Sequence, residues 1–305
     1  MSGFTKFENE GDVEHNKSAP DSTTAKWTHS SYVGDDREDF RLNKLDYSFR
    51  RQPIATTFYT IFPHINLISL TMGYCLLIIF FYILEIIMWT RNPWSCVIYE
   101  FGSNYTPAIQ RGQIQRLFMP GFLHNDVFHL IFNVFAMLSI GSNCEYYLGT
   151  LPYFGMLAGS IFLGNVFTAG FRTSVCTESV GGSVVVMGIL AFEFTWMYFN
   201  FSKMGRSKWL YGLWVGTIFG TAFFGTFVPG AVTELSGHIG GFLAGVCITG
   251  FFYYEIIKYR QMDLAKFAFP AIYVILAFIA IVTIIMRNTR RCWDNICDEG
   301  LDWVK

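Results

Sequence analysis

Residues 180–188 read VGGSVVVMG. Ser183 opens an apolar run that continues to residue 200, which predicts a membrane-spanning helix that begins beside this serine. Gly181 and Gly182 permit close approach of backbones and unusual dihedral angles, and the first amide groups of a helix have no partner inside it. Ser183 is therefore either a capping or packing residue, or a nucleophile next to free amide donors. The rest of the sequence must decide between the two.

The composition is typical of a membrane protein. Hydrophobic residues make up 52% of the 305 residues, charged residues 15%, and aromatic residues 18%. The net charge of −1 argues against nucleic acid as a partner. The start of the chain is polar and acidic, which predicts neither a cleaved signal peptide nor a mitochondrial presequence. The acidic residues concerned are Glu8, Glu10, Asp12 and Glu14.

Seven apolar segments are long enough to cross a bilayer, which takes about 20 residues. The predicted fold class is therefore an all-α polytopic membrane protein. Residues 1–60 lack sustained periodicity and predict a disordered cytosolic tail. Its basic end either contacts anionic lipid headgroups or is an ordinary flank of the first span. The predicted spans lie near residues 66–89, 122–142, 150–170, 182–200, 209–229, 235–257 and 267–286.

Basic residues in the connecting segments predict the orientation, because Lys and Arg gather on the cytosolic side. They precede the first span and separate the fourth from the fifth and the sixth from the seventh, which predicts a cytosolic N-terminus. The C-terminal tail then lies outside the cytosol, although its own arginines oppose this. The residues are Arg50, Arg51, Lys203, Arg206, Lys208, Lys258, Arg260 and Lys266 on the cytosolic side, and Arg287, Arg290 and Arg291 in the tail.

The seven cysteines divide between the two sides of this topology. Three fall in or near spans or the cytosol, and four fall on the oxidising side, where a disulfide can form. Their pairing cannot be deduced from sequence. The first group is Cys75, Cys144 and Cys247, and the second is Cys96, Cys176, Cys292 and Cys297. On the same side, Asn104-Tyr-Thr in the long loop 91–121 is either a glycosylation acceptor or a chance match.

The second span carries two polar side chains on one helical face, His129 and Asn133, four residues apart. Two hydrogen-bonding groups aimed into a helix bundle can stabilise an oxyanion. The alternative is that they only join helices, as polar side chains in membranes often do.

The sixth span places His238, Gly241 and Gly245 on one stripe of a helix. Small residues four apart let two membrane helices approach closely. An ionisable residue in a span costs roughly 2.5–3.5 kcal/mol, so His238 needs a partner, and a serine across a tight helix contact would supply one. Together, Ser183 is the candidate nucleophile and His238 the candidate general base, with His129 and Asn133 as candidate oxyanion donors. Glu234 is the acidic residue nearest in sequence that could orient His238.

These residues resemble the rhomboid family of intramembrane serine proteases over residues 110–250. The G-x-S motif that holds the family's nucleophile on its fourth helix corresponds to residues 181–183 here. The sixth helix of the family carries a His followed by G-x-x-x-G, which corresponds to His238, Gly241 and Gly245.

Three further motifs of the family occur in the same order. They are an H-x-x-x-N on the second helix with another His before it, a Trp-Arg in the first loop, and a G-x-x-x-E after the second helix. Gln replaces the Trp here, and we expect the Arg and the Glu to be structural residues that tie the first loop and the end of the second helix to the core. The corresponding residues are His129 and Asn133 with His124, Gln115 and Arg116, and Gly141 and Glu145.

The resemblance implies a six-helix core with a short fourth helix and an active site in a water-filled cavity below the outer surface. The last span, 267–286, is similar to the added helix of six-plus-one eukaryotic secretory-pathway rhomboids, which implies the secretory pathway or plasma membrane. The predicted domains are a disordered cytosolic tail, the catalytic core, a linker with the seventh helix, and an extracytosolic tail. Their boundaries are 1–60, 61–257, 258–286 and 287–305.

The implied activity is cleavage of single-span membrane proteins in or near their transmembrane helix by a Ser183–His238 dyad, without a cofactor or metal. Small residues and glycines in the substrate favour the local unwinding that exposes a carbonyl. The alternative is an inactive rhomboid-like protein that binds transmembrane clients and controls their trafficking or degradation. A transporter that uses His and Asn as a path is a third interpretation. A metalloprotease is disfavoured because the chain has no H-E-x-x-H motif.

Two residues depart from the family pattern. Val184 replaces the usual glycine after the serine, and Met187 replaces an aromatic residue that stacks on the histidine ring. A methionine contacts an imidazole more flexibly, so we expect an enzyme with altered rate or specificity. Glu85 and Glu193 are costly inside a bilayer, which predicts interhelical hydrogen bonds or protonated side chains.

Overall fold

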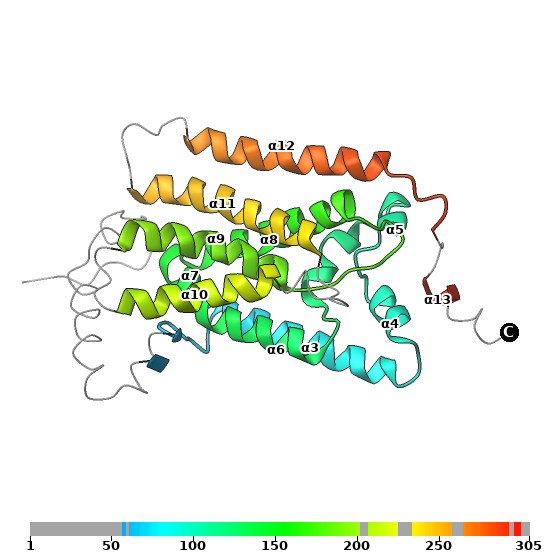
Figure 1. Ribbon diagram of the computed structural model, residues 1–305, viewed down its shortest axis with the longest axis horizontal. Helices are drawn as coiled ribbons and strands as arrows, with labels where there is room; N and C mark the ends of the chain where they lie inside the picture. The colour runs from blue at the N-terminus through cyan, green and yellow to red at the C-terminus, as the bar shows by residue number, and fades with distance from the viewer. Residues whose placement is uncertain are drawn as a thin grey trace, which may run out of the picture.

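The computed structural model describes residues 57–58, 61–201, 207–224, 234–257, 265–292 and 296–299. Long helices lie side by side, and short helices cover one end of the bundle (Figure 1). In chain order the helices are α3 (Leu70–Trp89), α4 (Trp94–Glu100), α5 (Thr106–Gln110), α6 (Val127–Ala136), α7 (Ser142–Leu148), α8 (Thr150–Phe171), α9 (Ser183–Asn200), α10 (Ser207–Phe224), α11 (Leu235–Ile257), α12 (Ala265–Met286) and α13 (Ile296–Glu299).

The predicted fold class is confirmed. The described part of the chain contains no named strand, and six of its helices are long and apolar enough to cross a membrane. These six are α3, the continuous helix Val127–Leu148, α8, α9, the first part of α11, and α12. The protein is therefore a multi-pass membrane protein. The remaining long helix, α10, corresponds to the predicted fifth span and is less apolar. Almost all of the predicted tail 1–60 lies outside the described residues.

The second span begins and ends later than the sequence predicts. The Asp126 carboxylate accepts a hydrogen bond from the His129 amide at 2.9 Å, so it caps a helix that begins at Val127 and not at residue 122. Met119–Phe122 form a separate 3₁₀ turn. The helix then continues through a π-helical turn at Met137–Gly141 and ends at Leu148, because Gly149 takes a positive φ of 79°.

Helices α8, α9 and α11 form the centre of the bundle. A Cβ atom added to Gly245 on α11 would overlap the Gly188 carbonyl of α9, and one added to Gly241 would overlap the Val184 carbonyl. The two backbones therefore touch at both levels, which only glycine allows. Helix α12 packs along α11 and α8 (Figure 1), and its Tyr273 hydroxyl donates to the Gly159 carbonyl of α8 at 2.9 Å.

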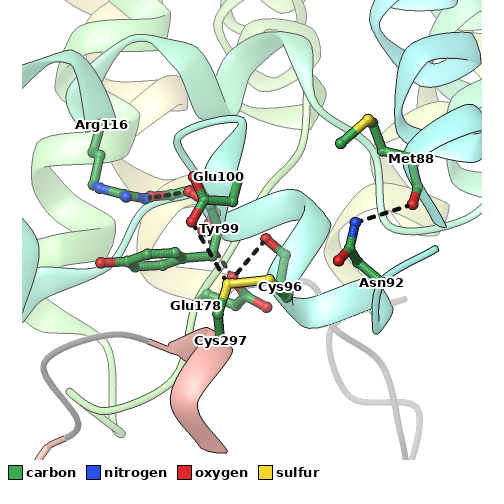
Figure 2. Close-up of a disulfide and its surroundings, with 9 residues drawn as sticks. Met88, Asn92, Cys96, Tyr99, Glu100, Arg116, Glu178 and Cys297 are labelled. Atoms are coloured by element: carbon green, nitrogen blue, oxygen red, sulfur yellow. Dashed lines mark hydrogen bonds between the residues drawn. A yellow bond between two sulfur atoms is a disulfide. The ribbon is translucent and has the colours of Figure 1, made fainter. Parts of the chain in front are cut away.

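Two charged side chains hold outer segments of the chain against the helix bundle. Glu145 on α7 accepts hydrogen bonds at 2.8 Å from the amides of Leu70 and Thr71, the first residues of α3. Arg116 donates to the carbonyls of Tyr99 and Ser103 at 2.9 and 3.0 Å, and its guanidinium lies over the Tyr99 ring (Figure 2). These contacts join the first loop and the end of α7 to the rest of the bundle.

The disulfide prediction is confirmed, and the structure supplies the pairing. Cys96 in α4 is bonded to Cys297 in α13 (Figure 2), and Cys176, in the loop before Ser183, is bonded to Cys292 after α12. The three cysteines assigned to spans or the cytosol are buried and free. Both bonds hold the segment after α12 against the end of the bundle where α9 begins.

The interpretation of Asn104 as a glycosylation acceptor is wrong for this fold. Its side chain is fully buried, and Nδ2 donates to the Asn165 carbonyl of α8 at 2.8 Å. An acceptor amide has to be exposed to receive a glycan. The backbone of Asn104 instead forms a bridge with Ser179, in the loop before α9.

Candidate active site

Backbone hydrogen bonds to two other segments fix the loop that precedes α9. Ser179 exchanges two backbone hydrogen bonds with Asn104, at 2.9 and 3.1 Å, and the Gly181 amide donates to the Pro120 carbonyl at 2.9 Å. Gly181 takes a φ of 150°, a conformation that glycine adopts without strain. Helix α9 then begins at Ser183.

Ser183 and His238 lie in direct contact. The distance from Ser183 Oγ to His238 Nε2 is 2.8 Å, and the two side chains are 8% and 2% exposed. The residues are 55 positions apart in sequence and belong to α9 and α11. The contact depends on the close approach of the two helices at Gly241, one turn beyond His238, where a Cβ atom would overlap the Val184 carbonyl. A serine hydroxyl bonded to a buried imidazole is the arrangement that a general base requires.

No acidic side chain completes a triad among the described residues. Nδ1 of His238 is buried and makes no hydrogen bond to them. Glu234 lies one turn earlier, but its carboxylate pairs with Arg172 at 3.3 Å, so it does not orient the imidazole. The geometry is that of a serine–histidine pair.

His129 and Asn133 stand in different positions relative to the serine. A Cβ atom on Gly181 would lie 2.8 Å from His129 Cε1 and 3.2 Å from Ser183 Oγ, so the imidazole and the serine hydroxyl lie on either side of the space that a side chain at position 181 would fill. Nε2 of His129 is buried and has no hydrogen-bond partner in the described part of the chain. Asn133 is fully buried, and its Nδ2 contacts His124 Nε2 at 3.0 Å.

The chain matches a family model and several known proteins. Residues 111–255 match the rhomboid domain. The chain is 31% identical to rhomboid-like protease 1 of Toxoplasma gondii, over 62% of this chain and 65% of that protein. It is 27% identical to rhomboid-like protease 3 of the same organism, over 65% of this chain and 74% of that protein.

Residues 111–255 form a rhomboid domain. The resemblance seen in the sequence is confirmed by these matches. The rhomboid domain contains α6 to α10 and most of α11, and so includes Ser183, His238, His129 and Asn133. Helix α12 lies beyond the matched residues.

His124 is a member of the site to which the sequence assigned no role. Its side chain is fully buried, and its ring lies 5.3 Å from that of His129. Burial lowers its pKa to about 3, with a smaller effect from His129, so the imidazole is neutral. Because Asn133 Nδ2 can only donate, His124 Nε2 accepts and the ring proton lies on Nδ1. The only sign of this in the sequence was that His124 lies five residues before His129.

The rhomboid domain is nearly closed around Ser183 in this conformation. The cavity beside the serine has about 10 Å³, roughly the space of one water molecule. It is lined by polar side chains and glycines, among them Asn165, Thr168, Gly181, Glu234 and Gly237. The cavity therefore has no room for a peptide segment among the described residues in this conformation.

The two residues that depart from the family pattern are both buried. The Val184 side chain faces α8, where a Cβ atom on Gly164 would lie 2.7 Å from Val184 Cβ, and one on Gly237 of α11 would lie 3.4 Å from Cγ1. Glycines on both neighbouring helices thus make room for the larger residue. Met187 is 2% exposed and belongs to the main hydrophobic core.

The two intramembrane glutamates differ in their surroundings. Glu193 on α9 accepts hydrogen bonds from Asn143 at 3.0 Å and from the Tyr211 hydroxyl at 2.7 Å, so it joins α7 and α10 to α9. Both carboxyl oxygens of Glu85 are buried without a hydrogen bond to the described residues. Neither residue lines the cavity at Ser183.

One cluster has the spacing of metal ligands among the described residues, and it lies away from the site. It consists of Cys96, Glu100 and Cys297 (Figure 2). The two sulfurs are bonded to each other, so they offer no thiolate to a metal.

Proposed function

We propose that this rhomboid is an intramembrane serine endopeptidase, with Ser183 as nucleophile and His238 as general base. The observation that carries the proposal is the 2.8 Å contact between Ser183 Oγ and His238 Nε2, inside a bundle of membrane-spanning helices. The similarity to proteins named rhomboid-like proteases supports it.

The first half of the reaction forms an acyl-enzyme. Ser183 Oγ attacks the carbonyl carbon of the substrate while its proton passes to His238 Nε2. The electron pair of the carbonyl moves onto oxygen and gives a tetrahedral oxyanion. The C–N bond then breaks as the imidazolium returns the proton to the leaving amine, and an ester to Ser183 remains.

The second half releases the other product. Water gives a proton to His238 and attacks the ester carbon, and the second tetrahedral oxyanion collapses as the proton returns to Ser183 Oγ. This step regenerates the enzyme.

His129 and Asn133 are the proposed oxyanion donors. The amide of Asn133 carries two hydrogens, and its contact with His124 uses one of them. The free amides at the start of α9 add further donors. His124 would orient the Asn133 amide by accepting its first hydrogen. Loss of one donor to an oxyanion typically lowers the rate roughly 10²–10³-fold.

The proposed substrates are single-span membrane proteins whose helix unwinds near its extracytosolic end. A serine enclosed within a membrane bundle reaches an extended segment and not an intact helix, since backbone carbonyls inside a helix are already bonded. The proposed topology places the N-terminus in the cytosol, and the two disulfides fit an extracytosolic position of the segment after α12. The proposed location is the secretory pathway or plasma membrane.

The test is cleavage of a single-span protein with glycines near its extracytosolic end, reconstituted with the purified full chain in proteoliposomes. We compare wild type with Ser183→Ala, His238→Ala and Ser160→Ala. Ser160 is also a fully buried serine, but it lies on α8 against Gly188. Wild type and Ser160→Ala are expected to release the ectodomain, and the other two variants are not. A wild type that binds the substrate without cutting it would favour the client-binding alternative.

A further inference from the structure

Arg172 is a buried arginine that follows the last residue of α8. Its side chain is 1% exposed and is the largest fully buried side chain among the described residues. A buried guanidinium is costly unless its donors find partners. Nη1 donates to the carbonyls of Asn104, at 3.1 Å, and Thr177, and Nη2 pairs with the Glu234 carboxylate at 3.3 Å.

The carbonyl partners of Arg172 belong to the segment that carries the serine. Thr177 lies in the loop before α9, and the Asn104 backbone pairs with Ser179 two residues further along. The Asn104 carbonyl accepts from both Arg172 and the Ser179 amide. Arg172 thus fixes this loop just before it turns at Gly181 toward Ser183.

The carboxylate partner of Arg172 belongs to the helix that carries the histidine. Glu234 immediately precedes α11, and its carbonyl accepts a hydrogen bond from the His238 amide at 3.2 Å. One guanidinium therefore joins the loop that leads to Ser183 and the first turn of the helix that leads to His238. Glu234 lies one helical turn before His238, and Thr177 lies in the loop six residues before Ser183.

The end of α8 is itself held from the other side. Arg287, just after α12, donates to the carbonyls of Gly170 and Arg172 at 2.6 and 2.5 Å. These are carbonyls that the end of a helix leaves unpaired. The backbone of Arg172 is therefore fixed independently of the guanidinium, so a change to its side chain tests the contacts of the side chain.

We propose that Arg172, paired with Glu234, is a positioning residue that sets the distance between Ser183 and His238. The proposal rests on the proposed function for its kinetic consequence. His238 lies in the first turn of α11, so the position of its imidazole depends on where α11 begins. A shift of about 1 Å in a reacting group can cost roughly 10²-fold in rate.

The kinetic test compares Arg172→Gln, Glu234→Gln, the double variant and Arg172→Lys. For Arg172→Gln we expect kcat to fall at least about tenfold with KM little changed, at a temperature where every variant is folded. Lysine keeps one charge for Glu234 but not the fork of donors, so Arg172→Lys restores part of kcat. The double variant is expected to be no slower than Arg172→Gln, because the two residues act as one unit.

Arg116→Gln is the matched control. Arg116 is another buried arginine that donates to two backbone carbonyls, but its hydrogen bonds go to Tyr99, Ser103 and Gln113, all in the first loop. We expect it to lower the unfolding temperature and to leave kcat per folded molecule near the wild-type value. An Arg172→Gln variant that behaves in the same way would overturn the positioning role.

A readout without turnover separates this proposal from the proposed function. In protein labelled with ¹⁵N at histidine, the His238 Nε2 resonance of wild type should move on Ser183→Ala, because that nitrogen is hydrogen-bonded to the serine hydroxyl. In the Arg172→Gln background the same substitution should leave the resonance unmoved. If wild type shows the response but cleaves nothing, the protease proposal fails and the positioning role stands. If Arg172→Gln retains the response, the positioning role is wrong.

Discussion

Helices α11 and α10 both pack against α9, but they do so by different means. Between α11 and α9 the backbones touch at Gly241 and Gly245, where an added Cβ would overlap a carbonyl of α9. Between α10 and α9 the contacts are made by side chains, such as the Tyr211 hydroxyl on Glu193 and the Phe219 ring on Phe194.

This difference predicts which helix tolerates substitutions. A backbone contact has no rotatable group that could relax, so the spacing of α9 and α11, and with it the Ser183–His238 contact, is fixed by geometry. Aromatic side chains can repack when a neighbour changes. The glycine Gly216 of α10 has nothing within 4 Å of its added Cβ. We therefore expect substitutions on α11 to affect stability and catalysis together, and those on α10 to affect stability alone.

The largest expected effect on cleavage is that of Gly245→Ala. The new methyl group would overlap the Gly188 carbonyl, so the helices must separate at a cost of about 1–3 kcal/mol or more, and cleavage should be nearly lost. The matched control is Gly216→Ala on α10, where the same methyl group meets no atom and alanine favours the helix by about 0.5–1 kcal/mol. Thermal unfolding in detergent and cleavage in proteoliposomes measure both. Equal effects of the two substitutions would remove the distinction between the helices.

The second effect concerns the Cys176–Cys292 disulfide, which ties the loop before Ser183 to the segment after α12. Its removal in the double variant Cys176→Ser/Cys292→Ser should cost about 2–4 kcal/mol, seen as a lower unfolding temperature. Cys247→Ser, at a buried free cysteine on α11, is the control. Reductant should lower the unfolding temperature of wild type and Cys247→Ser, and should have a smaller effect on the double variant. An unchanged unfolding temperature in the double variant would contradict this account.

The third effect depends on pH. The pKa of His124 is lowered to about 3 in the folded protein by burial, against about 6.5 in the unfolded chain. The unfolded state therefore binds the proton more readily, so the contribution of His124 is intact above about pH 6.5 and is lost as pH falls toward 3. At pH 4.5 the loss is about 2–3 kcal/mol. The His124→Gln variant lacks this titration, so its unfolding free energy should fall less than that of wild type between pH 7 and pH 4.5. If the unfolding free energies of the two proteins fell in parallel with pH, the lowered pKa of His124 would be refuted.

The smallest effect is expected on α10. Trp214 Nε1 donates to the Ser139 hydroxyl at 2.6 Å, and its ring packs edge-on against Phe135. Trp214→Phe keeps an aromatic ring and loses one hydrogen bond, worth about 0.5–1.5 kcal/mol. We expect a small fall in unfolding temperature with kcat unchanged. A kcat that fell as far as in Gly245→Ala would mean that α10 positions the dyad as well.

The features that the sequence could predict are those with a local signal. Composition and length predict seven spans, of which six are long and apolar enough to cross a membrane in the described part of the chain, while the fifth corresponds to the less apolar α10. The spacing of His238, Gly241 and Gly245 predicts the tight helix contact. The choice of Ser183 and His238 as a pair came from the same stripe of small residues. Their role in catalysis stays a prediction.

The features that the sequence missed are contacts between distant segments. Arg172 and Glu234 are 62 residues apart, and Asn104 is buried against Asn165. No local periodicity reports such contacts, because a buried arginine in a loop looks like any basic residue beside a span. The predicted start of the second span was also wrong, since Phe122 and Leu123 are apolar but precede the polar stretch 124–126, in which Asp126 caps the helix.

Covalent labelling tests most directly whether His238 activates Ser183. A fluorophosphonate reacts with an activated serine, and peptide mass spectrometry locates the adduct. We expect an adduct on Ser183 in folded wild type, none on Ser183 after heat unfolding, and a large loss of labelling in His238→Ala while that variant remains folded. Labelling of Ser183 at the same rate in His238→Ala, or no adduct on Ser183 in a wild type that cleaves substrate, would contradict this expectation.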